Sequence, residues 1–113
     1  MFVTRHKDAG EYHPPKHFGM VARRLQGMEA SDMKDFFVGL STLEPGGGAE
    51  EDASPFEKVY VVLSGEVTVV QDGEETVLGP LDSCGIAAGE SRSIVNKTKD
   101  PASMVVIIST RER

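Results

Sequence analysis

Short runs of β-type residues, separated by glycine and proline, dominate the hydrophobic pattern of the chain. The clearest is a hairpin in which residues 58–63 and 67–71 flank the turn Ser64-Gly65-Glu66. The other expected strands cover residues 19–25, 35–43, 76–78, 83–87, 91–96 and 102–109. No segment keeps a helical period beyond a turn or two. About eight short strands at this spacing predict an all-β fold, a small antiparallel barrel or a sandwich.

The first third of the chain is predicted to be an irregular arm. The adjacent prolines Pro14 and Pro15 favour an extended or turning segment there. A length of 113 residues fits one domain. We therefore assign residues 1–33 to an N-terminal arm and residues 34–113 to the barrel.

The segment between the expected strands at residues 35–43 and 58–63 has two parts. Pro45-Gly46-Gly47-Gly48 is predicted to end the first strand in a flexible turn. Residues 50–55 open with Glu50-Glu51-Asp52 and are predicted to form a solvated acidic loop. One of these acidic side chains is expected to turn inward.

Composition and charge narrow the classes of partner. The net charge of −6 counts against nucleic acid, which needs a basic face, and against an anionic membrane surface. No apolar run approaches the roughly 20 residues of a membrane span, and residues 1–10 have no apolar core of the signal-peptide kind. The single cysteine, Cys84, cannot form an internal disulfide. We expect a cytoplasmic protein with no nucleic-acid or membrane partner.

Gly46, Asp52, Ser54, Lys58 and Gly65 form one spaced group, and Ala87, Gly89, Arg92 and Asn96 form a second. The spacing of the two groups resembles that of the metal-binding motifs of the cupin superfamily. The first motif is glycine, five residues, His-x-His, three or four residues, Glu, six residues, Gly; the second is Pro-x-Gly, two residues, His, three residues, Asn. The slots of the first motif hold Gly46, Asp52, Ser54, Lys58 and Gly65, and those of the second hold Ala87, Gly89, Arg92 and Asn96. With the longer gap, Glu51 and Ala53 replace Asp52 and Ser54. The glycine frame is kept, and each metal-ligand position has changed.

This resemblance implies a small single-domain cupin barrel with degenerate metal sites and a pocket at one open end. It also implies a homodimer, with the arm at residues 1–33 packed on the partner. Lys58 and Arg92 stand where the motifs have metal ligands, and cations do not bind a metal ion. We therefore predict no metal and no cofactor.

Strand alternation indicates which side chains face the interior. If Lys58 points inward, so does Tyr60; if Arg92 points inward, so do Ile94 and Asn96. Two desolvated cations need a negative partner, either a bound anion or an internal carboxylate. The internal candidates are Glu50, Glu51, Asp52 and Glu57. A third alternative is a rebuilt metal site that uses His6, His13 or His17 with the acidic run.

The favoured hypothesis is a pocket for a small anionic or carbonyl metabolite, with Arg92, Lys58, Asp52 and Asn96 as ligand-binding residues. If the protein is an enzyme, metal-free proton transfer such as isomerisation, tautomerisation or cyclisation is expected, and the pKa of Lys58 should fall beside Arg92. The predicted catalytic residues are Lys58, Tyr60 and Glu57. The alternatives are a non-catalytic sensor or carrier, a metal-dependent enzyme, and a structural dimer with a relict pocket.

Overall fold

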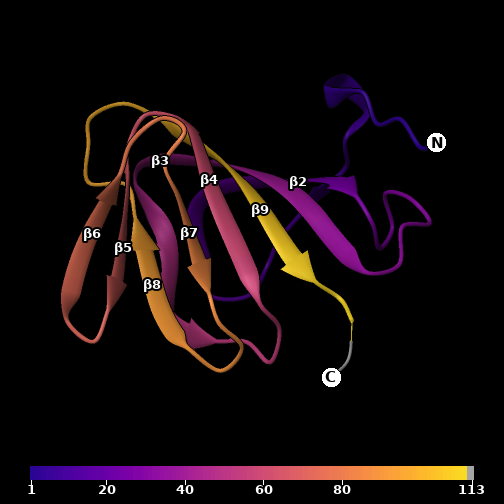
Figure 1. The fold of residues 1–113 in the computed structure, drawn as a ribbon. Coiled ribbons are helices and arrows are strands. Elements are labelled where there is room, and N and C mark those ends of the chain that lie inside the picture. Colours follow the sequence, from indigo (N-terminus) through magenta and orange to yellow (C-terminus); the bar gives the residue numbers. More distant parts are fainter. Residues whose placement is uncertain (112–113) are drawn as a thin grey trace.

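The computed structural model describes residues 1–111 and shows a nearly closed antiparallel β-barrel (Figure 1). The all-β prediction is therefore confirmed. The elements are the 3₁₀ turn η1 (His6–Asp8) and the strands β1 (Glu11–Tyr12), β2 (His17–Gln26), β3 (Phe36–Ala53), β4 (Lys58–Ser64), β5 (Val67–Gln71), β6 (Glu74–Leu78), β7 (Ser83–Ile86), β8 (Ser91–Val95) and β9 (Ala102–Ser109). Across residues 1–111, no helix has the length and apolar character that a membrane crossing requires.

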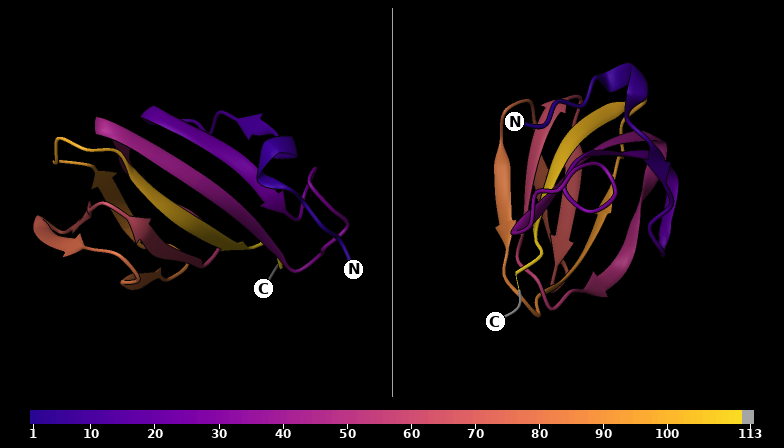
Figure 2. Two further views of the ribbon diagram at one scale, coloured as in Figure 1. Left: turned by 90° about the horizontal axis from the view of Figure 1, so that it is seen from above. Right: turned by 90° about the vertical axis from the view of Figure 1, so that its right-hand side faces the viewer.

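Strand β3 organises the barrel, because it pairs with three other strands. The strand order is β6-β5-β8-β3-β9-β4-β7, and β2 adds to β3 outside this path. The first half of β3 pairs with β9, and its second half pairs with β8. β3 therefore bends from one wall of the barrel to the other, which the two further views make visible (Figure 2).

The predicted end of this strand at Pro45-Gly46-Gly47-Gly48 is wrong, since β3 continues through these residues to Ala53 and has 18 residues in all. Gly46 has a φ of +82°, which an L side chain rarely adopts, and so it allows the bend. A side chain at Gly47 would meet the backbone of Gly19, and one at Gly48 would meet that of Ile94. The glycines thus let three strands approach closely rather than ending the strand.

The predicted acidic loop at residues 50–55 is also mostly strand. Asp52 pairs with Arg92, and Ala53 pairs with Ser91, in the ladder between β3 and β8. The charged side chains of Glu50 and Asp52 are exposed, so the segment has the composition of a loop although its backbone is paired. This pairing brings Asp52 next to the strand that holds Arg92.

Strand β2 lies within the segment assigned to the N-terminal arm. A short strand was predicted at residues 19–25, and β2 is longer, with 10 residues. It pairs along β3 from His17 to Gln26, and the two-residue β1 pairs with its outer edge. The contact of residues 1–33 with a partner subunit stays a prediction.

Alternation along the strands places side chains as expected. Tyr60 and Val62 of β4 are 2% and 0% exposed, and Arg92 and Ile94 of β8 are 3% and 2% exposed. They face a core to which each strand from β3 to β9 contributes. Arg92 is therefore a cation among apolar neighbours, and this makes its partners the first question about the site.

Candidate functional site

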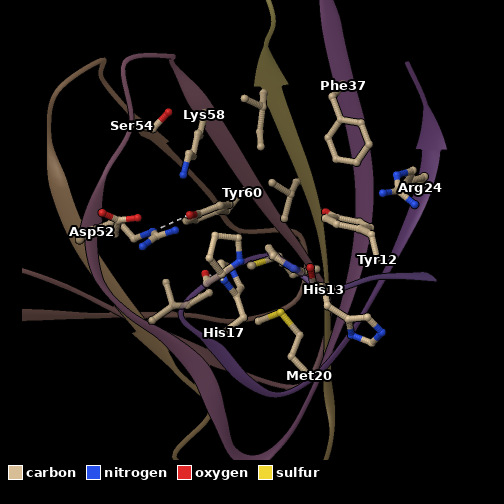
Figure 3. A pocket seen from close by; sticks show the side chains of 18 of the residues that line it. Tyr12, His13, His17, Met20, Arg24, Phe37, Asp52, Ser54, Lys58 and Tyr60 are labelled. Carbon is tan, nitrogen blue, oxygen red and sulfur yellow. Dashed lines mark hydrogen bonds between the residues drawn. The ribbon is translucent and has the colours of Figure 1, made fainter. Parts of the chain in front are cut away.

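A cavity of about 570 Å³ opens inside the barrel (Figure 3). Its walls come from β2, β3, β4, β8 and β9 and from the segment between β1 and β2. Lys58, Ser54 and Asp52 gather at one side, and Phe37, Tyr12 and Arg24 lie at the other. Three of the residues predicted from the sequence to face a ligand, Lys58, Tyr60 and Asp52, thus share one cavity with Arg92.

The guanidinium of Arg92 is fixed by two hydrogen bonds. Nε donates to the phenol oxygen of Tyr60 at 2.7 Å, and Nη1 donates to the backbone carbonyl of Glu50 at 3.3 Å. Within residues 1–111, Nη2 makes no hydrogen bond to protein. It is not one of the fully buried polar atoms that lack a hydrogen-bond partner, because the described residues contain none. Because the phenol accepts from Arg92, its own hydrogen can be donated elsewhere. The pair therefore offers two donors to a guest in the cavity.

Tyr60 remains a phenol at neutral pH. Burial raises the pKa of its hydroxyl, and the charge and hydrogen bond of Arg92 only partly oppose this. The guanidinium carbon of Arg92 lies over the Tyr60 ring at 5.9 Å from its centroid, near the outer limit of a cation–π contact.

Lys58 provides the second cation of the cavity. It is half-buried at the start of β4. Burial lowers the pKa of its ammonium group, the charge of Arg92 lowers it further, and Asp52 opposes both effects. The predicted direction of this shift is confirmed.

No carboxylate of the described residues forms an ion pair with either of the two cations. Among residues 1–111, neither Lys58 nor Arg92 has a carboxylate oxygen within 4.0 Å. Asp52, whose charge raises the pKa of Lys58, instead forms an ion pair with Lys16 at 3.4 Å on the exposed rim of the cavity. The Ala53 N–H and then Lys16 lower the pKa of the Asp52 carboxyl, so that it is ionised at neutral pH. Glu51 accepts a hydrogen bond from Ser91, also on the surface.

Two predicted site residues lie apart from the cavity. The Asn96 side chain donates to the carbonyls of Leu43 and Asp100, and its oxygen accepts from Thr98. It therefore holds the loop between β8 and β9 in place. Glu57 is exposed just before β4, where its carbonyl accepts from the Ser109 N–H. Neither residue is among those that line the cavity in the described chain.

His17 is the cavity residue that the sequence did not single out for proton transfer. Its Nδ1 lies 2.7 Å from the Pro15 carbonyl, which can only accept; Nδ1 therefore carries the proton, and Nε2 keeps a free lone pair. Burial lowers the pKa of the imidazole below its ordinary value of 6.5; the Pro15 bond opposes this, and the charges of Arg92 and Lys58 add to it. The available signal was a histidine two residues after Pro14-Pro15, and this does not predict burial.

The donors of the cavity do not fit a metal ion. The motif slots hold Lys58 and Arg92, which have no lone pair to offer and repel a cation. Within residues 1–111, no group of three or more His, Cys, Asp or Glu side chains is placed to hold a metal. His17 and His13 line the cavity, whereas the other ligand proposed for a rebuilt site, His6, lies in η1. What the arrangement can do is bind an anion and transfer protons.

A bacterial protein is related to this chain over nearly its whole length. Beta-D-galactosidase Rv1717 of Mycobacterium tuberculosis is 48% identical over 109 residues, which cover 96% of this chain and 94% of the relative. Identity at this level over this coverage means that the two proteins share one fold and one family.

Solved structures show the same barrel. The polyketide cyclase RemF from Streptomyces resistomycificus superposes with a TM-score of 0.86 at 18% identity, covering 98% of this chain and 80% of that one. A cupin-superfamily sugar phosphate isomerase from Silicibacter pomeroyi has a TM-score of 0.69 at 26% identity, with 80% and 60% covered. The family model described as the cupin domain matches residues 39–108. The chain therefore belongs to the cupin family.

Proposed function

We propose that this chain is a metal-independent cupin that binds a small sugar-derived anion, such as a sugar acid or sugar phosphate, and transfers a proton on it. The observation that carries the proposal is the pair of cations, Lys58 and Arg92, in one cavity without a carboxylate within 4.0 Å in residues 1–111. Desolvated cations are costly unless a negative group balances them. A guest carboxylate or phosphate supplies that balance.

Arg92 orients the bound anion, and Lys58 supplies a positive charge that can move to follow it. The bonds to Tyr60 and Glu50 hold the guanidinium still, so Nη2 points in a fixed direction when a ligand arrives. A pre-positioned donor loses little entropy on binding. Lys58 is a mobile point charge that can follow the anion.

Proton transfer would use His17 and Tyr60. The free Nε2 lone pair of His17 is a base at neutral pH, since burial keeps the ring neutral. A C–H proton next to a carbonyl would pass to Nε2, and the electron pair would move onto the carbonyl oxygen. The Tyr60 hydroxyl and the Lys58 ammonium are the groups that would stabilise that oxygen. In this scheme His17 replaces Glu57, which does not line the cavity.

The comparisons support a sugar as the ligand class. The relative at 48% identity carries the name Beta-D-galactosidase, and the structure at 26% identity is named a sugar phosphate isomerase. Together with the cationic cavity, this favours a sugar that carries an acidic group. D-galacturonate combines both properties, and as an open-chain aldehyde it has an acidic C2–H.

Lys58→Met tests the charge requirement directly. The variant should bind D-galacturonate about tenfold more weakly, because one charge-assisted contact of roughly 1.5–3 kcal/mol is lost. Its free energy of unfolding should be unchanged or higher by less than about 1 kcal/mol, because a half-exposed charge repelled by Arg92 is removed. Calorimetric titration and thermal unfolding measure the two effects.

The matched control is Lys97→Met, which removes a lysine bound to Glu75 on the surface. It should bind D-galacturonate like the unmodified protein. Equal binding by Lys58→Met and Lys97→Met would refute a role for the cavity charge. If the sugar acid binds but its C2–H never exchanges with deuterated solvent, the site is a sensor or carrier rather than an enzyme.

Hydrolysis of β-D-galactosides is a second candidate, favoured by the name of the 48% identical relative. Glycoside hydrolysis commonly uses two carboxyl groups, one on each side of the scissile bond. Asp52 and Glu29 are the carboxylates that line the cavity within the described residues. Asp52, ionised through its bonds to Ala53 and Lys16, is the better placed stabiliser of positive charge on the sugar.

If hydrolysis is the reaction, Asp52→Asn should lower turnover of 4-nitrophenyl β-D-galactoside at least 100-fold, while Glu51→Gln, a change outside the cavity lining, should not. Release of 4-nitrophenol is the measurement. If the unmodified protein releases none, or if Asp52→Asn matches it, the carboxylate mechanism fails. Proton transfer would instead depend on His17 and persist in Asp52→Asn.

We also propose a homodimer that forms through the outer face of the sheet β2-β3-β9-β4. Outward side chains alternate there with those of the cavity, and most are apolar: Val21, Leu25, Val38, Leu40, Val59, Val61, Leu63, Val105 and Ile107. Val59 and Leu63 are 38% and 43% exposed. The apolar positions named above carry no charge, and the carboxylates near them are Glu44 on β3 and Glu11, which pairs with Arg23; two chains of net charge −6 would meet most readily on such a mainly apolar face.

Val105→Asp should convert the dimer to a monomer, because two copies of the new carboxylate would be buried close together. Sedimentation velocity at high micromolar concentration measures the change. Val77→Asp, on the exposed outer side of β6, is the matched control and should stay dimeric. A monomeric unmodified protein would contradict the proposal.

A further inference from the structure

The cavity has two chemically different ends. At one end stand Arg92, Lys58 and Asp52; at the other stand Phe37, Tyr12 and Arg24 (Figure 3). Much of the remaining wall is apolar, since Met20, Ile94, Met104, Val106 and Ile108 line the cavity alongside the polar Ser41 and His17. A sugar acid bound to Arg92 would leave the far end and much of this wall uncovered.

The volume of the cavity also favours a ligand larger than a single sugar ring. About 570 Å³ lies within the range of roughly 300–1,000 Å³ that holds drug-sized ligands. A single sugar ring is much smaller than such ligands. Contact between water and an apolar wall contributes no favourable free energy of binding. An apolar group of the ligand that displaces this water is stabilised by its burial.

The far end is built as an aromatic corner. The rings of Tyr12 and Phe37 meet edge to face, with centroids 5.5 Å apart at 89°, and Arg24 covers the Tyr12 ring at 4.9 Å. Gly39 leaves room for this corner: a Cβ there would lie 2.9 Å from the Tyr12 hydroxyl and 3.0 Å from the Phe37 ring. Flat aromatic surfaces in such a corner suit a flat apolar group.

We propose that the physiological ligand is amphipathic, with its anionic sugar group at Arg92 and Lys58 and an aryl or alkyl group against Tyr12, Phe37 and Ile108. This inference rests on the proposed function for its anionic anchor. It adds a second subsite and a substrate class, an aryl- or alkyl-substituted acid, which the anchor alone does not require. Ile108 belongs to both ends, since its strand neighbours are Phe37 and Lys58.

The test is a series of carboxylates with the same anionic group and increasing apolar area: acetate, benzoate and 2-naphthoate. Each added ring should strengthen binding to the unmodified protein about tenfold, as expected from roughly 25 cal/mol for each Å² of apolar surface buried. Ile108→Ser and Tyr12→Ala should each reduce the gain from benzoate to 2-naphthoate to less than about threefold. Tyr12→Ala, at the end away from Lys58 and Arg92, should leave acetate binding unchanged.

Ile107→Ser is the matched control, since it removes an isoleucine from the same strand on its outer side. It should keep the full tenfold gain. Equal affinity for benzoate and 2-naphthoate in the unmodified protein would overturn the second subsite, as would a gain that survives in both cavity variants. Loss of the anchor is a separate outcome: if Arg92→Leu binds all three acids normally, the proposed function fails instead.

Discussion

Arg92→Leu is expected to weaken binding of D-galacturonate by one to two orders of magnitude. Arg92 is 3% exposed, and it is held by Tyr60 and Glu50 with Nη2 free for a guest. Each hydrogen bond between charged groups contributes roughly 1.5–3 kcal/mol in such a setting. Leucine keeps part of the volume and removes the donors. Calorimetric titration at low ionic strength measures the loss.

The fold should survive this change. The substitution removes a desolvated cation, which stabilises the apo protein, and leaves the Tyr60 hydroxyl without its partner, which destabilises it. Arg92→Lys keeps the charge without the planar fork and should lose less affinity than Arg92→Leu. Arg23→Leu has the same change in net charge on the outer side of β2 and should bind normally. A folded Arg92→Leu protein with unchanged affinity would exclude Arg92 as the anchor.

His17→Gln is expected to lower the rate of proton transfer by about 10²- to 10⁴-fold, the usual contribution of a general base. Glutamine can still donate to the Pro15 carbonyl, so the local structure should remain, while the basic lone pair of Nε2 is lost. Exchange of the C2–H of D-galacturonate in deuterated solvent, followed by NMR, measures this rate without knowledge of the final product. The dissociation constant should change less than about threefold.

The pH profile gives a second readout for His17. Its pKa is lowered, so the neutral base persists above that pKa, and kcat/KM should fall only when the pH drops below the ordinary histidine value of 6.5. On the alkaline side, affinity should fall as Lys58 loses its proton, below its ordinary pKa of 10.5. His17→Gln should lose the acidic limb, and His13→Gln, which also lines the cavity but is exposed, should keep it. An intact acidic limb in His17→Gln would contradict the role of His17.

Local patterns predict most of the barrel. In the hairpin at residues 58–71, alternation alone places Lys58, Tyr60 and Val62 inward, because side chains of a strand alternate between its faces. The same pattern fails at Pro45-Gly46-Gly47-Gly48. There the glycines serve close contact with Gly19 and Ile94, which are distant in sequence, and no local signal distinguishes this from a turn.

The site is predictable as far as strand geometry fixes it. Arg92 and Lys58 share a cavity because both side chains point inward and lie close enough for the charge of Arg92 to lower the pKa of Lys58. Asn96 shares the inward face of Arg92, yet its amide is used by the loop that follows. His17 becomes a half-buried base only when β2 crosses the bend of β3, a long-range pairing that a single sequence does not reveal.

A crystal structure of untagged protein, purified without chelator and soaked with D-galacturonate, tests the central claim most directly. The account predicts a planar carboxylate between Nη2 of Arg92 and Nζ of Lys58, with the sugar ring below Tyr60 and no anomalous signal from a metal. A metal peak among these side chains, or a guanidinium turned out of the barrel into solvent, would contradict it.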